Sequence, residues 1–138
     1  MVILSIDIGK TFGAAVSVDN EIEFTQEITL ESLAQVEKWV KDLVDIWKPN
    51  LILIPYPTRF YYVIIKHAKI MGVIELIAEK KEITVIEVND ATCKKVVLGS
   101  GKARKEDIAN HYKSIHPDIK SEHILDCVMF RDWFVKAS

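Results

Sequence analysis

Three strand-forming segments precede the first helical pattern in this chain. Residues 2–6 are rich in β-forming side chains, and residues 12–18 follow a turn that contains Gly9. After a second turn at Asp19 and Asn20, residues 21–28 alternate polar and apolar side chains, as a half-solvated strand does. The order predicts that the chain opens with a three-stranded antiparallel meander.

Helices and strands alternate after the meander. Apolar side chains recur at helical spacing in two long segments, and a short, wholly apolar strand typical of full burial lies between them. The predicted elements are helices over residues 31–47, 60–79, 102–115 and 122–135, and strands over residues 51–54 and 83–88. Gly72 lies inside the second helix, which predicts a close approach to another backbone there. The order βββαβαβαα predicts an α/β fold with a mixed five-stranded sheet flanked by helices, the ribonuclease H-like arrangement.

Composition and length narrow the class of protein. A chain of 138 residues with 49% hydrophobic and 28% charged side chains is typical of one globular domain, here residues 1–138, and not of a disordered chain. The apolar runs are too short to span a bilayer, and the first residues lack the basic segment of a signal peptide. The two cysteines, Cys93 and Cys127, fit free thiols in a reducing, cytoplasmic setting.

Charge is distributed unevenly although the net charge is only −2. Residues 19–45 contain eight acidic and two basic side chains, whereas residues 93–105 contain five basic side chains and no acidic one. These five are Lys94, Lys95, Lys102, Arg104 and Lys105. The pattern predicts either a local anion-binding face or a solvated loop.

Two carboxylates and a histidine are the candidates for chemistry. Asp7 ends the first strand beside a glycine-containing turn, a place suited to holding a cation, although such a sequence also simply forms turns. His123 and Asp126 share one face at the start of the last helix because they are three residues apart. Asp126 lies among apolar residues, where an unpaired carboxylate is costly, so a metal ion shared with Asp7 is one way to neutralise it.

Three segments resemble RuvC-type Holliday-junction resolvases. Residues 4–19, LSIDIGKTFGAAVSVD, resemble the first strand pair of that family, with Asp7 at the first catalytic aspartate. Residues 71–108 resemble its central stretch, most specifically over residues 94–105. Residues 121–130, SEHILDCVMF, are similar to its final acidic motif, with Asp126 at the last catalytic position. His123 stands where bacterial resolvases usually have aspartate and resembles instead the RuvC nuclease domains of CRISPR effectors.

The resemblance implies a homodimeric endonuclease that resolves four-way DNA junctions by paired phosphodiester hydrolysis. Asp7, Asp126 and His123 would then hold Mg²⁺ or Mn²⁺, with His123 also suited to act as general base. The five basic residues would contact phosphates, and Phe60 or Tyr61 would stack on bases at the junction. Spare apolar positions on the second helix (Ile64, Ile65 and Ile70) would form the dimer contact.

One departure from the family leaves alternatives open. The family has a glutamate at the end of the strand that corresponds to residues 51–54, whereas this chain has Pro55 and Tyr56 there. Glu75 is a candidate replacement ligand if its side chain faces the sheet, and surface exposure is the alternative. An inactive protein that binds junctions or other branched DNA is a second possible function. A phosphate-binding domain of the actin-like or sugar-kinase type is a third, suggested by residues 7–11, DIGKT.

Overall fold

The computed structural model describes residues 1–57 and 61–138, apart from the side chains of residues 61 and 62. Its strands are β1 (Val2–Asp7), β2 (Thr11–Val18), β3 (Glu21–Thr29), β4 (Leu51–Pro55) and β5 (Thr84–Val88). Its helices are α1 (Leu33–Trp47), α2 (Tyr61–Lys80), α3 (Asp90–Leu98), α4 (Lys105–Tyr112) and α5 (Glu122–Ala137).

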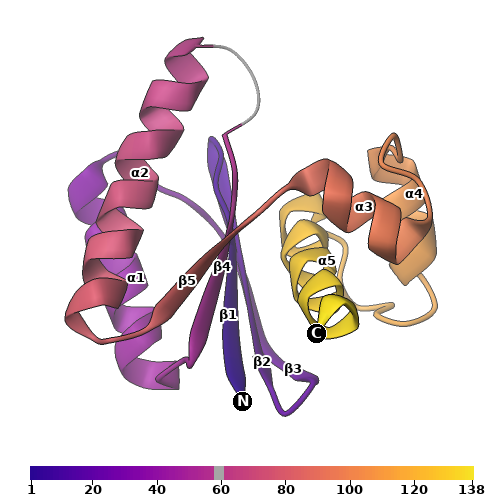
Figure 1. Cartoon of the computed structure of the whole chain (residues 1–138), viewed down its shortest axis with the longest axis horizontal. Coiled ribbons are helices and arrows are strands. Elements are labelled where there is room, and N and C mark those ends of the chain that lie inside the picture. The colour runs from indigo at the N-terminus through magenta and orange to yellow at the C-terminus, as the bar shows by residue number, and fades with distance from the viewer. Residues whose placement is uncertain (58–60) are drawn as a thin grey trace.

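The strands form one mixed five-stranded sheet in the order β3-β2-β1-β4-β5. The first three pair antiparallel, as the meander predicts, and β4 pairs in parallel with both β1 and β5. Helices α1 and α2 cover one face of the sheet, and α3, α4 and α5 lie on the other (Figure 1). The predicted fold class is confirmed.

Helix α3 is an addition to the predicted elements. Its N-terminus is capped by Asn89, whose side-chain oxygen accepts a hydrogen bond of 3.1 Å from the Thr92 N–H. Its C-terminus ends at Gly99, which has a positive φ of 88° that glycine adopts without strain. Both end signals are present in the sequence, but the helix has nine residues and buries only Cys93 and Val97. The basic residues 94 and 95 therefore belong to a helix and not to a loop.

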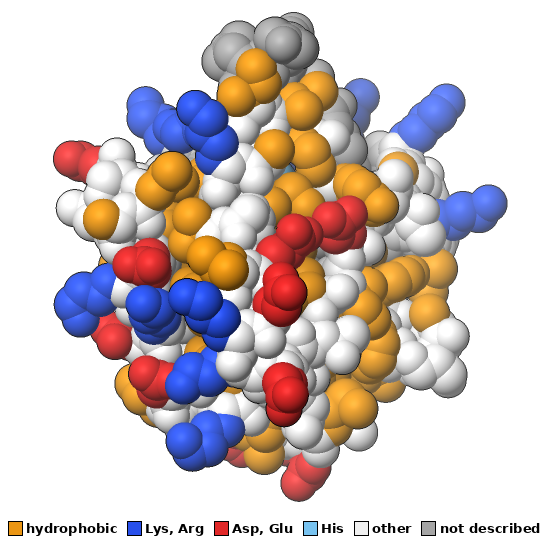
Figure 2. All heavy atoms as spheres, turned by 60° about the vertical axis from the view of Figure 1, so that its left-hand side comes forward, with side chains coloured by type: hydrophobic (Ala, Val, Ile, Leu, Met, Phe, Trp, Pro, Cys, Tyr) orange, Lys and Arg blue, Asp and Glu red, His pale blue; other side chains and the backbone are white. Residues whose placement is uncertain are grey.

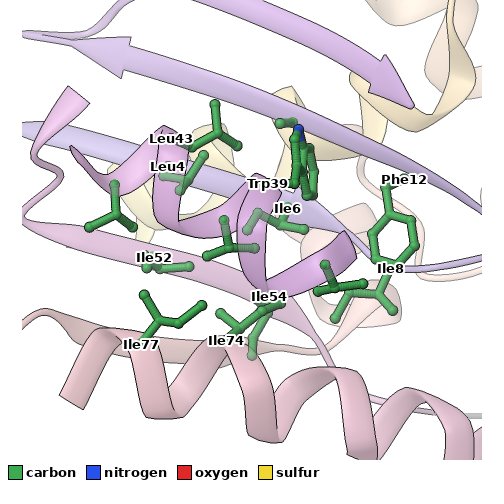
Figure 3. Packing of buried hydrophobic residues seen from close by; sticks show 14 of the residues in the cluster. Leu4, Ile6, Ile8, Phe12, Trp39, Leu43, Ile52, Ile54, Ile74 and Ile77 are labelled. Atoms are coloured by element: carbon green, nitrogen blue, oxygen red, sulfur yellow. The ribbon is translucent and has the colours of Figure 1, made fainter. Parts of the chain in front are cut away.

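Strand alternation sends side chains into two cores. Leu4 and Ile6 of β1, together with Ile52 and Ile54 of β4, pack under α1 and α2 (Figure 3). The intervening residues, among them Ile3, Leu51 and Leu53, face the other core, to which α3, α4 and α5 contribute. Cys93 and Cys127 are free and buried in this second core, as predicted. Asp7 and Pro55 continue the second series, so both face the side of α5.

Two glycines have opposite surroundings. A β-carbon on Gly13 would lie 2.6 Å from the carbonyl oxygen of His123, so β2 and the start of α5 touch where Gly13 has no side chain. A β-carbon on Gly72 would meet no atom within 4 Å, so the predicted close approach at that position is wrong.

Within residues 1–57 and 61–138, no helix combines the length and apolar character needed to cross a bilayer.

Candidate active site

Asp7 lies at the carboxyl end of β1, next to the start of α5. Its partner across the β1–β2 pair is Gly13, and Gly13 is in turn paired with Glu27 of β3. These three positions therefore form a row across the sheet on the face that α5 covers. Because Gly13 has no side chain, the backbone of His123 lies directly over the middle of this row. The row therefore places one acidic side chain on each side of His123, Asp7 on one side and Glu27 on the other.

The N-terminus of α5 is fixed by Ser121. Its hydroxyl oxygen accepts a hydrogen bond of 3.2 Å from the Ile124 N–H, and the same hydroxyl donates to Glu27 Oε1 at 2.7 Å. The His123 ring is thereby held with Nδ1 3.1 Å from Asp7 Oδ2. Its Nε2 lies 4.0 Å from Glu27 Oε1 and 3.8 Å from Glu122 Oε1. Carboxylates thus surround both ring nitrogens.

Asp126 lies one helical turn after His123, and its carboxyl group is close enough to that of Asp7 for the two to influence each other's pKa. Burial is the largest cause that raises the pKa of Asp7 to about 7, and the negative charge of Asp90 adds to it. Burial also raises the pKa of Asp126 to about 8, with the charges of Asp7 and Asp90 adding to the effect. Burial and the surrounding negative charge thus disfavour ionisation of both carboxyls.

The end of β4 contributes no acidic side chain to this site. Pro55 faces the site, and its carbonyl oxygen lies 2.8 Å from Nε2 of the buried His67 on α2. Burial lowers the pKa of His67. The Glu87 carboxylate raises the pKa of the next residue, Tyr56. The structure therefore has no acidic side chain at the end of β4, where the resolvase family has a glutamate.

An acidic residue, Asp90, follows the end of β5 and lies near the end of β4, which has none. Val88 is paired with Pro55, and the Tyr56 N–H donates a 2.9 Å hydrogen bond to the Val88 carbonyl oxygen. Asp90 follows two residues later as the first residue of α3 and forms a 2.7 Å ion pair with Lys94. Sequence analysis missed Asp90. The sequence shows an acidic residue just beyond a predicted strand, but it does not show the register that brings β5 beside β4.

One open cavity of about 310 Å³ joins these groups. It is lined by the predicted Asp7, His123 and Asp126 and by further residues from both sides of the sheet: Ile8, Pro55, Tyr56, Val63, His67, Asp90, Lys94, Lys105, Ile108, Glu122 and Phe130. The three catalytic candidates, which lie up to 119 positions apart in the sequence, therefore share one site. Lys94 and Lys105 are the predicted basic residues that line it.

The other predicted basic residues do not line the cavity: Lys95 lies on α3, and Lys102 and Arg104 lie on the chain that connects α3 to α4. Lys95, Lys102 and Arg104 are exposed, and Lys105 forms a 2.9 Å ion pair with Glu122. Glu75 does not line the cavity. It is exposed on α2, and burial together with the neighbouring Glu87 raises its pKa.

Phe60 and Tyr61 are the two aromatic residues predicted to stack on bases. Phe60 lies outside the described residues, and so does the side chain of Tyr61.

The donor chemistry of the cavity fits a hard divalent cation. Asp7, Asp90 and Asp126 bring carboxylate oxygens, the ligands that Mg²⁺ and Mn²⁺ prefer. Their excess negative charge, expressed in the raised pKa values of Asp7 and Asp126, is what such a cation would neutralise. As the side chains stand, no three acidic, histidine or cysteine groups in the described part of the chain are arranged around a common ion position.

Comparisons with known proteins agree on one family. A family model described as crossover junction endodeoxyribonuclease RuvC matches residues 10–128. A curated crossover junction endodeoxyribonuclease RuvC from Prochlorococcus marinus (strain MIT 9312) is 31% identical over 81 residues. That alignment covers 56% of this chain and 50% of the relative, so it spans about half the length of the relative.

Solved structures show the same fold at low sequence identity. Thermus thermophilus RuvC is 16% identical with a TM-score of 0.80, and 99% of this chain and 96% of that chain are covered. The same protein in complex with Holliday junction substrate has a TM-score of 0.84 at 16% identity, with 99% and 94% covered. The fowlpox virus Holliday junction resolvase is 15% identical with a TM-score of 0.66, and both chains are covered completely. Because the family model matches most of its length, this chain belongs to the RuvC family of crossover junction endodeoxyribonucleases.

Proposed function

We propose that residues 1–138 form one nuclease domain that acts in the cytoplasm and resolves four-way DNA junctions by paired, metal-dependent hydrolysis of phosphodiester bonds. The observation that carries this proposal is the shared cavity of Asp7, His123 and Asp126, with Lys94 and Lys105 beside them. Carboxylates that hold cations and lysines that hold phosphate are the parts that phosphodiester hydrolysis needs. Membership of the RuvC family and the likeness to a resolvase solved with Holliday junction substrate support this substrate class.

Asp7 and Asp126 are the ligands proposed for Mg²⁺ or Mn²⁺, with His123 as a further ligand when the ion is Mn²⁺, which accepts imidazole more readily. The bound ion supplies charge that stabilises the negative phosphate in the transition state. Burial raises the pKa values of both carboxyls, so the pair binds protons more tightly than free aspartates do. Loading of the site therefore releases protons and becomes more favourable as the pH rises.

His123 is proposed to remove the proton from the attacking water. When Asp7 is ionised, the His123 Nδ1–H donates to Asp7 Oδ2 over the 3.1 Å that separates them, and this leaves Nε2 with a free lone pair. The Oε1 atoms of Glu27 and Glu122 lie 4.0 Å and 3.8 Å from this nitrogen. Asp7 thus orients the base as well as holding the cation.

The basic residues of α3, of α4 and of the turn between them are proposed to hold the DNA backbone. Lys94 and Lys105 line the cavity, where the scissile phosphate would lie, and Lys95, Lys102 and Arg104 are exposed farther along the same segment. Contacts of this kind position DNA without reading its sequence. The proposed stacking of Phe60 or Tyr61 on bases at the junction centre rests on the family resemblance alone.

The proposed homodimer would use the face formed by α1 and α2. Hydrophobic side chains are exposed between acidic and basic ones on this face (Figure 2). On α2, Ile65 is 40% exposed and Leu76 is 50% exposed. Ile70, which the sequence suggested as a contact residue, is buried in the core and does not serve this purpose. Sedimentation tests the proposal, which predicts that the wild type is a dimer and that a variant with Ile65→Glu and Leu76→Glu is a monomer.

Asp7→Asn tests the proposed function. We expect the variant to bind a synthetic four-way junction as tightly as the wild type while it loses cleavage in Mg²⁺, because Asp7 holds the cation and the lysines hold the phosphates. Cleavage at the wild-type rate by Asp7→Asn at saturating Mg²⁺ would refute the assignment of the site. The measurements are a gel-shift titration and a cleavage time course on the same junction.

An inactive junction-binding protein is the second candidate function, because β4 ends on Pro55 where the family has an acid. This candidate predicts tight junction binding by the wild type with no cleavage in either Mg²⁺ or Mn²⁺.

A further inference from the structure

Strand β4 ends without an acidic side chain, but Asp90, just beyond the end of the neighbouring strand β5, lines the cavity. Strands β1, β4 and β5 are parallel neighbours, so their carboxyl ends meet at one edge of the sheet. At that edge β1 ends on Asp7, β4 ends on Pro55, and Asp90 lies two residues beyond the end of β5. Because Val88 is paired with Pro55, the chain leading to Asp90 begins directly beside the gap.

From this placement we infer that Asp90 is a metal ligand that takes over the function of the acid missing from β4. The inference rests on the proposed metal-dependent nuclease. Asp90 and both proposed carboxylate ligands line the same cavity, whereas Glu75, the replacement suggested by the sequence, does not. An aspartate at the first position of a helix has an ordinary explanation, the favourable interaction with the helix dipole, but that explanation does not require the side chain to face this cavity.

Lys94 is the ion-pair partner of Asp90. The two side chains form an ion pair of 2.7 Å one helical turn apart, and Lys94 is only 20% exposed. A lysine so placed neutralises the carboxylate and competes with a cation for it. With a cation bound, Asp90 would be one of its ligands and the Lys94 ammonium would be free to contact phosphate. The ion pair therefore makes a prediction that a purely structural function of Asp90 does not make.

Mn²⁺ binding to the protein without DNA provides the test. The signal of free Mn²⁺ in electron paramagnetic resonance gives the dissociation constant for the wild type, Asp90→Asn, Lys94→Gln and a control, Asp42→Asn. The control removes a similar pair, because Asp42 binds Lys38 at 3.0 Å on α1, far from the cavity in the sequence and on the other face of the sheet. Thermal unfolding without metal verifies that each variant is folded.

We expect Asp90→Asn to weaken Mn²⁺ binding by about tenfold or more, in line with the loss seen when groups around a metal are removed. Lys94→Gln should tighten it severalfold because the competing cation is gone, and Asp42→Asn should leave it unchanged. Equal Mn²⁺ affinity for Asp90→Asn and the wild type would overturn the inference, as would weaker or unchanged binding by Lys94→Gln. Either result, in a wild type that binds Mn²⁺ and cuts junctions, leaves the proposed function standing. A wild type that binds junctions but no Mn²⁺ overturns both.

Discussion

Replacing Gly13 with alanine tests how the sheet positions His123. The added β-carbon would lie 2.6 Å from the His123 carbonyl oxygen, which is 0.8 Å less than the 3.4 Å at which ordinary van der Waals contact begins. The contact is with backbone, so rotation of a side chain does not relieve it and the start of α5 must move. A shift of about that size lengthens the 3.1 Å contact between His123 Nδ1 and Asp7 Oδ2 beyond hydrogen-bonding distance. Misplacement of a catalytic group by about 1 Å costs roughly 100-fold in rate, and overpacking costs about 1–3 kcal/mol in stability.

Single-turnover cleavage of a four-way junction, together with junction affinity and thermal unfolding, measures these effects. The expected result for Gly13→Ala is slower cleavage with nearly unchanged junction binding, because the basic residues of α3 and α4 are not touched. Gly72→Ala is the matched control, since its added β-carbon meets no atom within 4 Å. We expect the control to cleave at the wild-type rate and to be more stable by about 0.5–1 kcal/mol, as alanine is in a helix. The reasoning is refuted if Gly13→Ala cleaves within about threefold of the wild type with an unchanged melting temperature.

The remaining predictions concern pH, salt and Glu75. Without metal, the free energy of unfolding should fall by a few kcal/mol as the pH rises from about 4 to about 8, because the raised pKa values of Asp7 and Asp126 mean that the folded state binds protons more tightly than the unfolded state does. Melting temperatures across this pH range measure the fall, and Asp126→Asn should reduce it, whereas a flat profile in the wild type would contradict the description of the pair. In junction binding, the plot of log affinity against log salt concentration should become shallower by roughly two in a variant with Lys102→Ala and Lys105→Ala, since each phosphate contact contributes nearly one counterion. An unchanged slope would place the DNA on another face. Glu75→Gln should leave metal binding and cleavage unchanged because Glu75 does not line the cavity, and loss of activity would show that α2 supplies a ligand.

The strands and the long helices could be predicted because burial leaves a periodic record in the sequence. The wholly apolar β4 indicates burial on both faces, and the alternation in β3 indicates one solvated face. Helix α3 lacks such a record because it is short and buries few side chains, so only its end residues, Asn89 and Gly99, signal it. The sequence also predicts nothing in particular at Gly13, since the close approach of α5 depends on tertiary packing.

Some residues of the candidate site could likewise be predicted from the sequence, and others could not. Asp7, His123 and Asp126 could be predicted from their position at a strand end and a helix start, and the structure brings them into one cavity. Asp90 could not, because its nearness to Asp7 depends on the register between β4 and β5, and no local pattern encodes it. Glu75 was suggested as a replacement ligand from its position in the helix, but helical spacing does not specify how a helix is rotated against the sheet.

Cleavage of a synthetic four-way junction by the purified protein tests the central claim most directly. Each strand of the junction is labelled in turn, and products are followed in Mg²⁺, in Mn²⁺ and in a chelator, with linear duplex of the same sequence as the control. The proposed function predicts nicks at symmetric positions in two opposing strands, dependence on the divalent ion, stronger activity in Mn²⁺ than in Mg²⁺, and little cleavage of the duplex. Tight binding of the junction with no nick in either metal ion would contradict it and would identify the protein as an inactive junction-binding member of the family.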